Sequence, residues 1–169
     1  MGLLFEIFQD MLFAAIAAIG FASISNTPFH VIKYCALLGA VGHGLRFVLM
    51  NCAGWHIIVS ATLAALVIGS LSVLYAPKAK CPPETFSFPS LLPMIPGMYA
   101  YRTVQGLVMC LSSQDESVFN HYFYLMSYNG ITCFIIVAGM VVGVTLPIFI
   151  FKRISFSATR EILKGSYND

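Results

Sequence analysis

Charged residues are scarce in this chain, at 9% of the sequence. A soluble domain carries roughly a quarter charged residues, because its surface must face water. Apolar residues make up 59%, so the composition excludes a soluble domain and favours an integral membrane protein. The net charge of only +2, without a long basic run, also gives no reason to expect nucleic acid as a partner.

The sequence also lacks the motifs of common catalytic and metal sites. It contains no CxxC pair, no GxSxG, no HExxH and no glycine-rich phosphate loop. Its cysteines are odd in number and lie mostly in apolar segments, which is typical of free, inert thiols rather than of a disulfide framework or a zinc site. We therefore expect no enzyme, no cofactor and no metal ion. The cysteines are Cys35, Cys52, Cys81, Cys110 and Cys133.

Long apolar runs predict an all-α integral membrane protein with about five transmembrane helices. A span needs about 20 apolar residues, and the first run has acidic residues where a signal peptide would have basic ones, so we expect a retained helix. We expect polar loops at residues 76–86 and 112–117, and an aromatic stretch from residue 119 lying along the membrane interface. The predicted transmembrane domain, residues 1–151, has spans at 3–24, 31–50, 55–75, 88–111 and 129–151, followed by a cytoplasmic tail at 152–169.

Basic residues are absent from two of the predicted loops, those between the second and third spans and between the fourth and fifth. Lys and Arg instead follow the first span, occupy the loop after the third, and recur in the tail. Cytoplasmic segments carry the excess of Lys and Arg. We therefore predict an amino terminus outside and a carboxyl terminus in the cytoplasm.

Ionisable residues inside a span are costly and need a partner or a water-filled cavity. Asp10 lies about 10 Å along the first span, and Arg46 and His43 lie about 8 and 12 Å before the end of the second, at a rise of about 1.5 Å per residue. These depths allow Asp10 to meet Arg46 or His43. A structural ion pair with an ordinary packed histidine is the alternative. Glu6, one turn from Asp10, is expected to be solvated, and Arg102 places a further cation in the fourth span.

Small residues surround His43 in the second predicted span, in the stretch from Gly39 to Gly44. They predict either close helix packing through Ala36, Ala40 and Gly44 or a cavity lined by backbone. The strongest local signal is Pro93-Met94-Ile95-Pro96-Gly97, because two prolines cannot both sit in an unbroken helix. Secondary transporters use such breaks to line substrate sites. The alternative is a kinked helix that begins at Pro96.

The segment from Cys35 to Arg46, CALLGAVGHGLR, together with the later Pro93–Gly97 element and Tyr99, resembles the threonine/serine exporter (ThrE) family. The likeness is to the small, YjjB-like second subunit of the split two-component form. It implies secondary export of small carboxylates, threonine and serine or a succinate-like dicarboxylate, across a bacterial inner membrane. It also implies a larger YjjP-like partner subunit and leaves room for a higher oligomer. Arg102 is not part of that family's pattern.

On this reading the chain is a subunit of a proton- or ion-coupled exporter. Arg46 and Arg102 are the predicted carboxylate ligands, and Asp10 and His43 the proton carriers. The rival hypothesis is a non-transporting membrane scaffold that stabilises the larger partner, and a membrane enzyme is a more distant third. The predicted substrate-binding residues are Arg46, Arg102, Pro93, Pro96, Gly97 and Tyr99.

Overall fold

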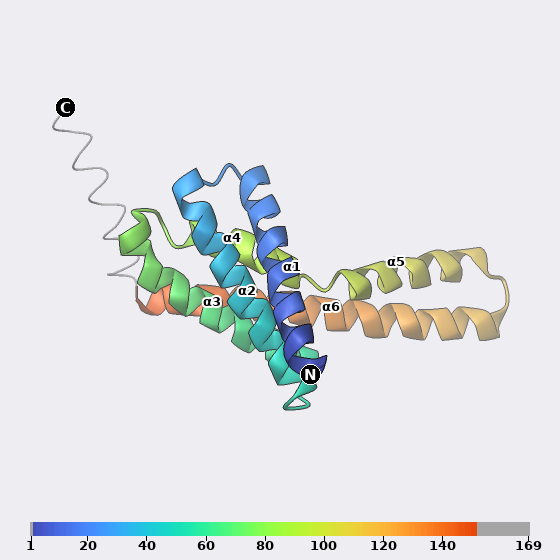
Figure 1. Cartoon of the computed structure of the whole chain (residues 1–169). Helices are drawn as coiled ribbons and strands as arrows, with labels where there is room; N and C mark the ends of the chain where they lie inside the picture. The colour runs from blue at the N-terminus through green and yellow to red at the C-terminus, as the bar shows by residue number, and fades with distance from the viewer. Residues whose placement is uncertain (1, 152–169) are drawn as a thin grey trace.

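The computed structural model of the chain describes residues 2–151, which form helices and short loops, with no strand within that range. Figure 1 shows a bundle of helices from which one helical hairpin projects. Among the described residues, four helices are long and apolar enough to cross a membrane: α1 (Gly2–Ile24), α2 (Phe29–Asn51), α3 (Ile57–Ala79) and α6 (Glu116–Ile150). The predicted cytoplasmic tail, 152–169, lies outside the described residues.

The predicted span at 88–111 is not one continuous helix. This part of the chain forms α4 (Glu84–Leu91), the 3₁₀ turn η1 (Leu92–Met94) and α5 (Gly97–Ser112). The interval between η1 and α5 falls within the predicted proline element. Ile95 is extended, with φ −55° and ψ 131°, as expected for a residue that precedes a proline. The residues predicted as a polar loop at 76–86 belong largely to the last turn of α3 and the start of α4.

Helix α6 runs without interruption over 35 residues, about 52 Å at the helical rise. That length exceeds the roughly 30 Å of a hydrocarbon core. The sequence placed the fifth span at 129–151 and its aromatic start separately along the interface, whereas the structure joins both in one helix. Asp115 begins this helix, because its carboxylate accepts a hydrogen bond of 2.8 Å from the Ser117 amide.

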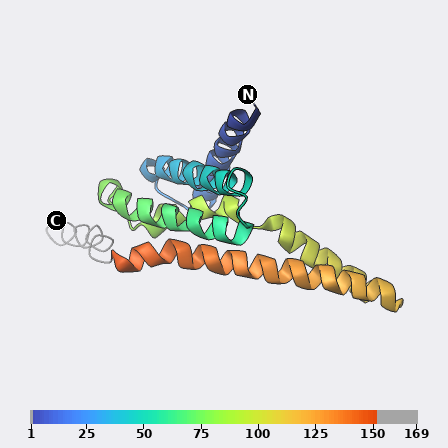
Figure 2. The ribbon, with the colours of Figure 1, turned by 90° about the horizontal axis from the view of Figure 1, so that it is seen from below.

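The hairpin consists of α5 and the first half of α6, which extend together from the bundle (Figures 1 and 2). The two helices approach closely where Gly106 faces Met126: a Cβ built on the glycine would lie 3.0 Å from the Met126 backbone. The lack of a side chain at Gly106 therefore sets the spacing of the hairpin.

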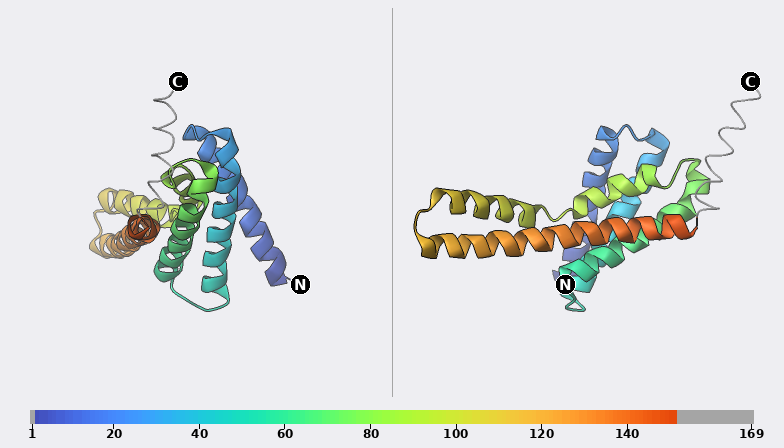
Figure 3. Two further views of the ribbon diagram at one scale, coloured as in Figure 1. Left: turned by 90° about the vertical axis from the view of Figure 1, so that its left-hand side faces the viewer. Right: turned by 180° about the vertical axis from the view of Figure 1, so that it is seen from behind.

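The second half of α6 packs on α3 through Gly139 and Gly143, which have GxxxG spacing. Both lie against Thr62 of α3. Further along the two helices, Gly69 lies against the Val144 backbone. These contacts advance together along both helices, so α3 and α6 run in the same direction (Figure 3). Residues 80–115 must therefore bring the chain back from the end of α3 to the start of α6.

Close packing of α2 uses its glycines, including Gly44 of the predicted small-residue face, rather than Ala36 and Ala40 of that face. Gly39 lies against Ala18 of α1 and Gly42 against Ile68 of α3. Both glycines are buried, whereas the two alanines are half-buried. The apolar side chains that remain exposed lie on the outer faces of every long helix, as expected where lipid rather than water surrounds the chain.

Candidate functional site

Three ionisable side chains from two helices form a continuous hydrogen-bonded chain. The Asp10 carboxylate Oδ2 lies 2.5 Å from His43 Nδ1. His43 Nε2 lies 2.8 Å from a terminal nitrogen of Arg46, three residues further along α2. The other terminal nitrogen of Arg46 donates to the Met94 carbonyl oxygen at 3.0 Å. We call Asp10, His43 and Arg46 the relay. The sequence predicted that Asp10 would meet one of the other two, and it meets His43.

The hydrogen bonds of the relay fix the tautomer of its histidine. A guanidinium nitrogen can only donate, so His43 Nε2 must accept from Arg46. The hydrogen of a neutral imidazole is then on Nδ1, where it is donated to Asp10. The relay therefore reads carboxylate, neutral imidazole, guanidinium. A proton added at Nε2 would remove the acceptor that Arg46 uses.

Glycines in α2 allow this contact between helices. Gly44 faces the Met11 side chain of α1, and a Cβ at Gly42 would approach the Met94 sulfur at 3.4 Å. A Cβ at Gly44 would collide with Met11 of α1. A Cβ at Gly42 would collide with the Ile68 side chain of α3 while only touching Met94. The sequence GHG around His43 thus brings the imidazole close to both neighbours.

The break between η1 and α5 supplies the last acceptor of the relay. After Met94 the regular ladder stops, and the Gly97 amide bonds to the Ile95 carbonyl at 2.8 Å. The Met94 carbonyl is thereby freed from the pattern of a continuous helix and accepts from Arg46. The sequence signal for a broken backbone was the proline element, but nothing in the sequence indicated that this particular carbonyl would meet Arg46.

A family model described as "Threonine/Serine exporter, ThrE" matches residues 10–150. This chain belongs to the threonine/serine exporter family. The match contains all of the relay and the whole broken segment. No solved structure matches the chain. Family membership together with the apolar helices makes the chain a multi-pass membrane protein of a transporter family.

In this exporter-family chain, the other predicted site residues are divided between two places. Pro93, Pro96 and Tyr99 lie at or beside the break, with Pro96 buried and Tyr99 packed against the core. Gly97 is exposed and has open space around its Cα. Arg102 lies in the hairpin, where it lines a pocket between α5 and α6 rather than joining Arg46.

The relay is only partly enclosed. The side chains of Asp10 and His43 keep 24% and 16% of their surface exposed, and Glu6, one turn away, is exposed. Within residues 2–151, no three His, Cys, Asp or Glu side chains gather closely enough to hold a metal ion. The groups available at the site are therefore a carboxylate, an imidazole, a guanidinium and a backbone carbonyl.

Proposed function

We propose that this chain is the small membrane subunit of a secondary transporter that exports threonine or serine, and that the relay is its substrate and proton site. The observation that carries this proposal is the bonding of Arg46. Its two terminal nitrogens bond a neutral imidazole and a carbonyl, and neither partner is an anion. A carboxylate is a stronger acceptor than either, so a substrate carboxylate can bind the guanidinium by replacing the Met94 carbonyl.

The relay suits an amino acid better than a dicarboxylate. It presents one cation, Arg46, and one partly exposed carboxylate, Asp10. A zwitterion needs this combination, because its ammonium group requires an acidic partner. A succinate-like substrate would need a second cation, and Arg102 lies in a different part of the chain.

We assign proton coupling to His43. An imidazole can change charge within the physiological pH range. Protonation at Nε2 would displace Arg46, so a bound proton and the Arg46 arrangement that holds the substrate exclude each other. Proton entry from outside would then release the substrate outward, which is antiport. This exclusion rests on the tautomer that the two hydrogen bonds require.

The chain path is compatible with five crossings and an amino terminus outside. Helices α3 and α6 run in the same direction, so the segment containing α4, η1 and α5 would return the chain across the membrane as a broken element. Together with the Lys and Arg asymmetry, this favours a cytoplasmic carboxyl terminus in a bacterial inner membrane. An inverted half of this kind fits pairing with a larger partner subunit.

The test is efflux from cells that co-express this chain and the larger subunit, preloaded with threonine, serine or succinate. Arg46→Gln should lower threonine and serine efflux about 10- to 100-fold at equal membrane abundance, since a charge-assisted hydrogen bond contributes about 1.5–3 kcal/mol. Arg46→Lys retains the charge and should recover part of the activity. Unchanged efflux in Arg46→Gln would instead make the relay architectural and favour the scaffold hypothesis.

A further inference from the structure

The α5–α6 hairpin has an unusual distribution of polarity. Much of its exposed surface consists of large apolar side chains, although Arg102, Gln105 and His121 are exposed as well. A hairpin surrounded by water would expose few large apolar side chains, so this surface indicates a largely apolar environment. The exposed apolar side chains include Met98, Val104, Leu107, Val108 and Leu111 of α5 and Phe119, Phe123, Ile131 and Phe134 of α6.

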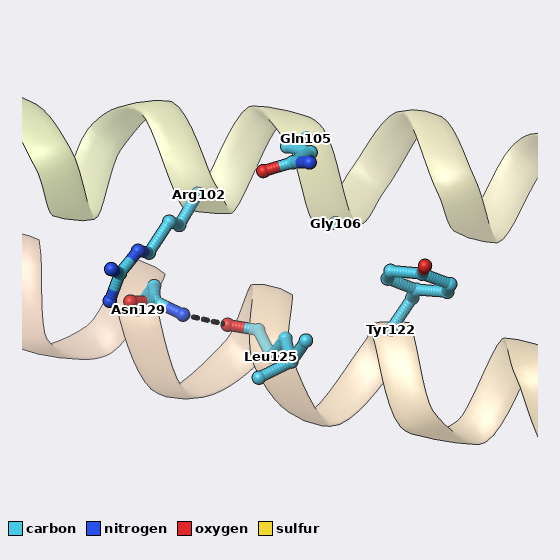
Figure 4. Close-up of a pocket in the computed structure, with 6 residues that line it drawn as sticks. All are labelled: Arg102, Gln105, Gly106, Tyr122, Leu125 and Asn129. Carbon is cyan, nitrogen blue, oxygen red and sulfur yellow. Dashed lines mark hydrogen bonds between the residues drawn. The ribbon is translucent and has the colours of Figure 1, made fainter.

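The polar side chains line a cavity of about 280 Å³ next to the Gly106 contact. Figure 4 shows Arg102 and Gln105 reaching into it from α5, and Tyr122 and Asn129 from α6. At about 30 Å³ per water molecule, the cavity has room for roughly nine waters. This is enough space for a small solute or a lipid headgroup, and less than a typical drug-sized pocket.

The chemistry of the cavity suits an anion. Arg102 brings a permanent cation with five N–H donors, and Gln105 and Tyr122 add neutral donors. No Asp or Glu lines the cavity, and within residues 2–151 Arg102 forms no salt bridge. Asn129, which is only 4% exposed, donates to the Leu125 carbonyl at 2.6 Å, and this bond holds its side chain in place at the wall of the cavity.

Arg102 is exposed, and no carboxylate of the cavity wall neutralises it. Its planar guanidinium is the side chain best matched to a carboxylate or a phosphate. We propose that the Arg102 cavity is a second anion site, which binds a carboxylate or a phosphate between α5 and α6. It is separate from the relay, because it lies on different helices. The anion can come from the transported solute or from the phosphate of an acidic lipid. Either would accept hydrogen bonds from the Arg102 guanidinium.

The first test uses the unmodified sequence, so it does not depend on a variant folding. The complex with its larger subunit is placed in nanodiscs of phosphatidylcholine, and the rate at which phenylglyoxal modifies Arg102 is followed by peptide mass spectrometry. Threonine and succinate form one arm, and phosphatidylglycerol mixed into the lipid forms the other. We expect protection of about tenfold in one arm, and that arm identifies the source. Equal rates in every condition would overturn the proposal.

A second test measures affinity for the protecting anion in an Arg46→Gln background, which removes the proposed transport site. Adding Arg102→Gln should weaken binding at least tenfold, whereas Tyr101→Phe, on the exposed side of the same helix, should leave it unchanged. Binding unaffected by Arg102→Gln would refute the site. Because this assay does not depend on Arg46, its failure would leave the proposed transport function standing.

Discussion

Proton and substrate should compete at the relay, and this competition can be measured as a pH dependence. Protonated His43 cannot accept from Arg46, whose guanidinium nitrogen lies 2.8 Å from Nε2 in the structure. One proton then excludes one substrate. Linkage predicts that the apparent affinity for the substrate falls about tenfold for each unit by which the pH is lowered where His43 is mostly protonated. Where His43 is neutral, the affinity should not depend on pH. The groups facing the imidazole are Asp10, Arg46 and, through Arg46, the Met94 carbonyl.

His43→Gln separates the acceptor role of the imidazole from its proton. The glutamine amide oxygen can accept from Arg46, but it does not titrate between pH 5 and 8. We expect affinity at pH 8 within about threefold of the wild type, a difference of roughly 0.6 kcal/mol, and no slope toward acid. His30→Gln is the matched control. His30 bonds the Ala79 carbonyl at 3.2 Å, away from the relay, so that variant should keep the wild-type slope.

The assay is equilibrium binding of labelled threonine to the purified two-subunit complex between pH 5.5 and 8, accompanied by counterflow in proteoliposomes. Competition between proton and substrate at His43 is refuted if the affinity of the wild type does not depend on pH, or if that of His43→Gln still does. Affinity that rises toward acid would mean that the proton and the substrate bind together, which is the signature of cotransport rather than exchange.

Two further predictions concern packing and orientation. Gly143→Ala should lower the thermal stability in detergent, because the new Cβ would lie 2.6 Å from the Thr62 carbonyl oxygen and overpacking costs about 1–3 kcal/mol. Gly20→Ala should leave the thermal stability unchanged, because the space around Gly20 is open. A loss of stability in Gly20→Ala would contradict the packing argument. A membrane-impermeant maleimide should label exposed Cys52 from outside intact cells and leave Cys81 unlabelled. Burial raises the pKa of the Cys81 thiol, so in inverted vesicles its labelling should be slow at pH 7 and faster as the pH rises. Labelling of Cys81 but not Cys52 from outside intact cells would overturn the predicted orientation.

The relay could be anticipated because helical geometry is regular. A constant rise per residue put Asp10 and His43 at comparable depths, and the three-residue spacing put His43 and Arg46 on one face. The order of the three groups was not predictable. That order depends on how closely α1 approaches α2, which Gly44 sets against Met11.

The hairpin could not be predicted from apolar run lengths. Hydropathy marks where a helix can cross a membrane but does not show which helix it packs against. Residues 118–128 are aromatic and apolar, which suits an interface as well as a long helix. The structure makes them continuous with α6, and α5 packs against one side of them through the Gly106–Met126 contact, while Phe119 and Phe123 stay exposed. Arg102 was predicted as a carboxylate ligand together with Arg46, yet it belongs to the hairpin.

Energetics and exposure argue against a purely architectural relay. A buried charged network is seldom more stable than apolar side chains of the same volume, because each ion loses its hydration. Glycines in α2 already hold α1 and α3 closely, so packing does not require the charges. A network that only stabilised the fold would also be expected to be fully buried, whereas the side chains of Asp10 and His43 are partly exposed. Such exposure is what the proposed binding of a proton and a solute requires, and the bond of Arg46 to the Met94 carbonyl links the relay to the break at which α5 begins.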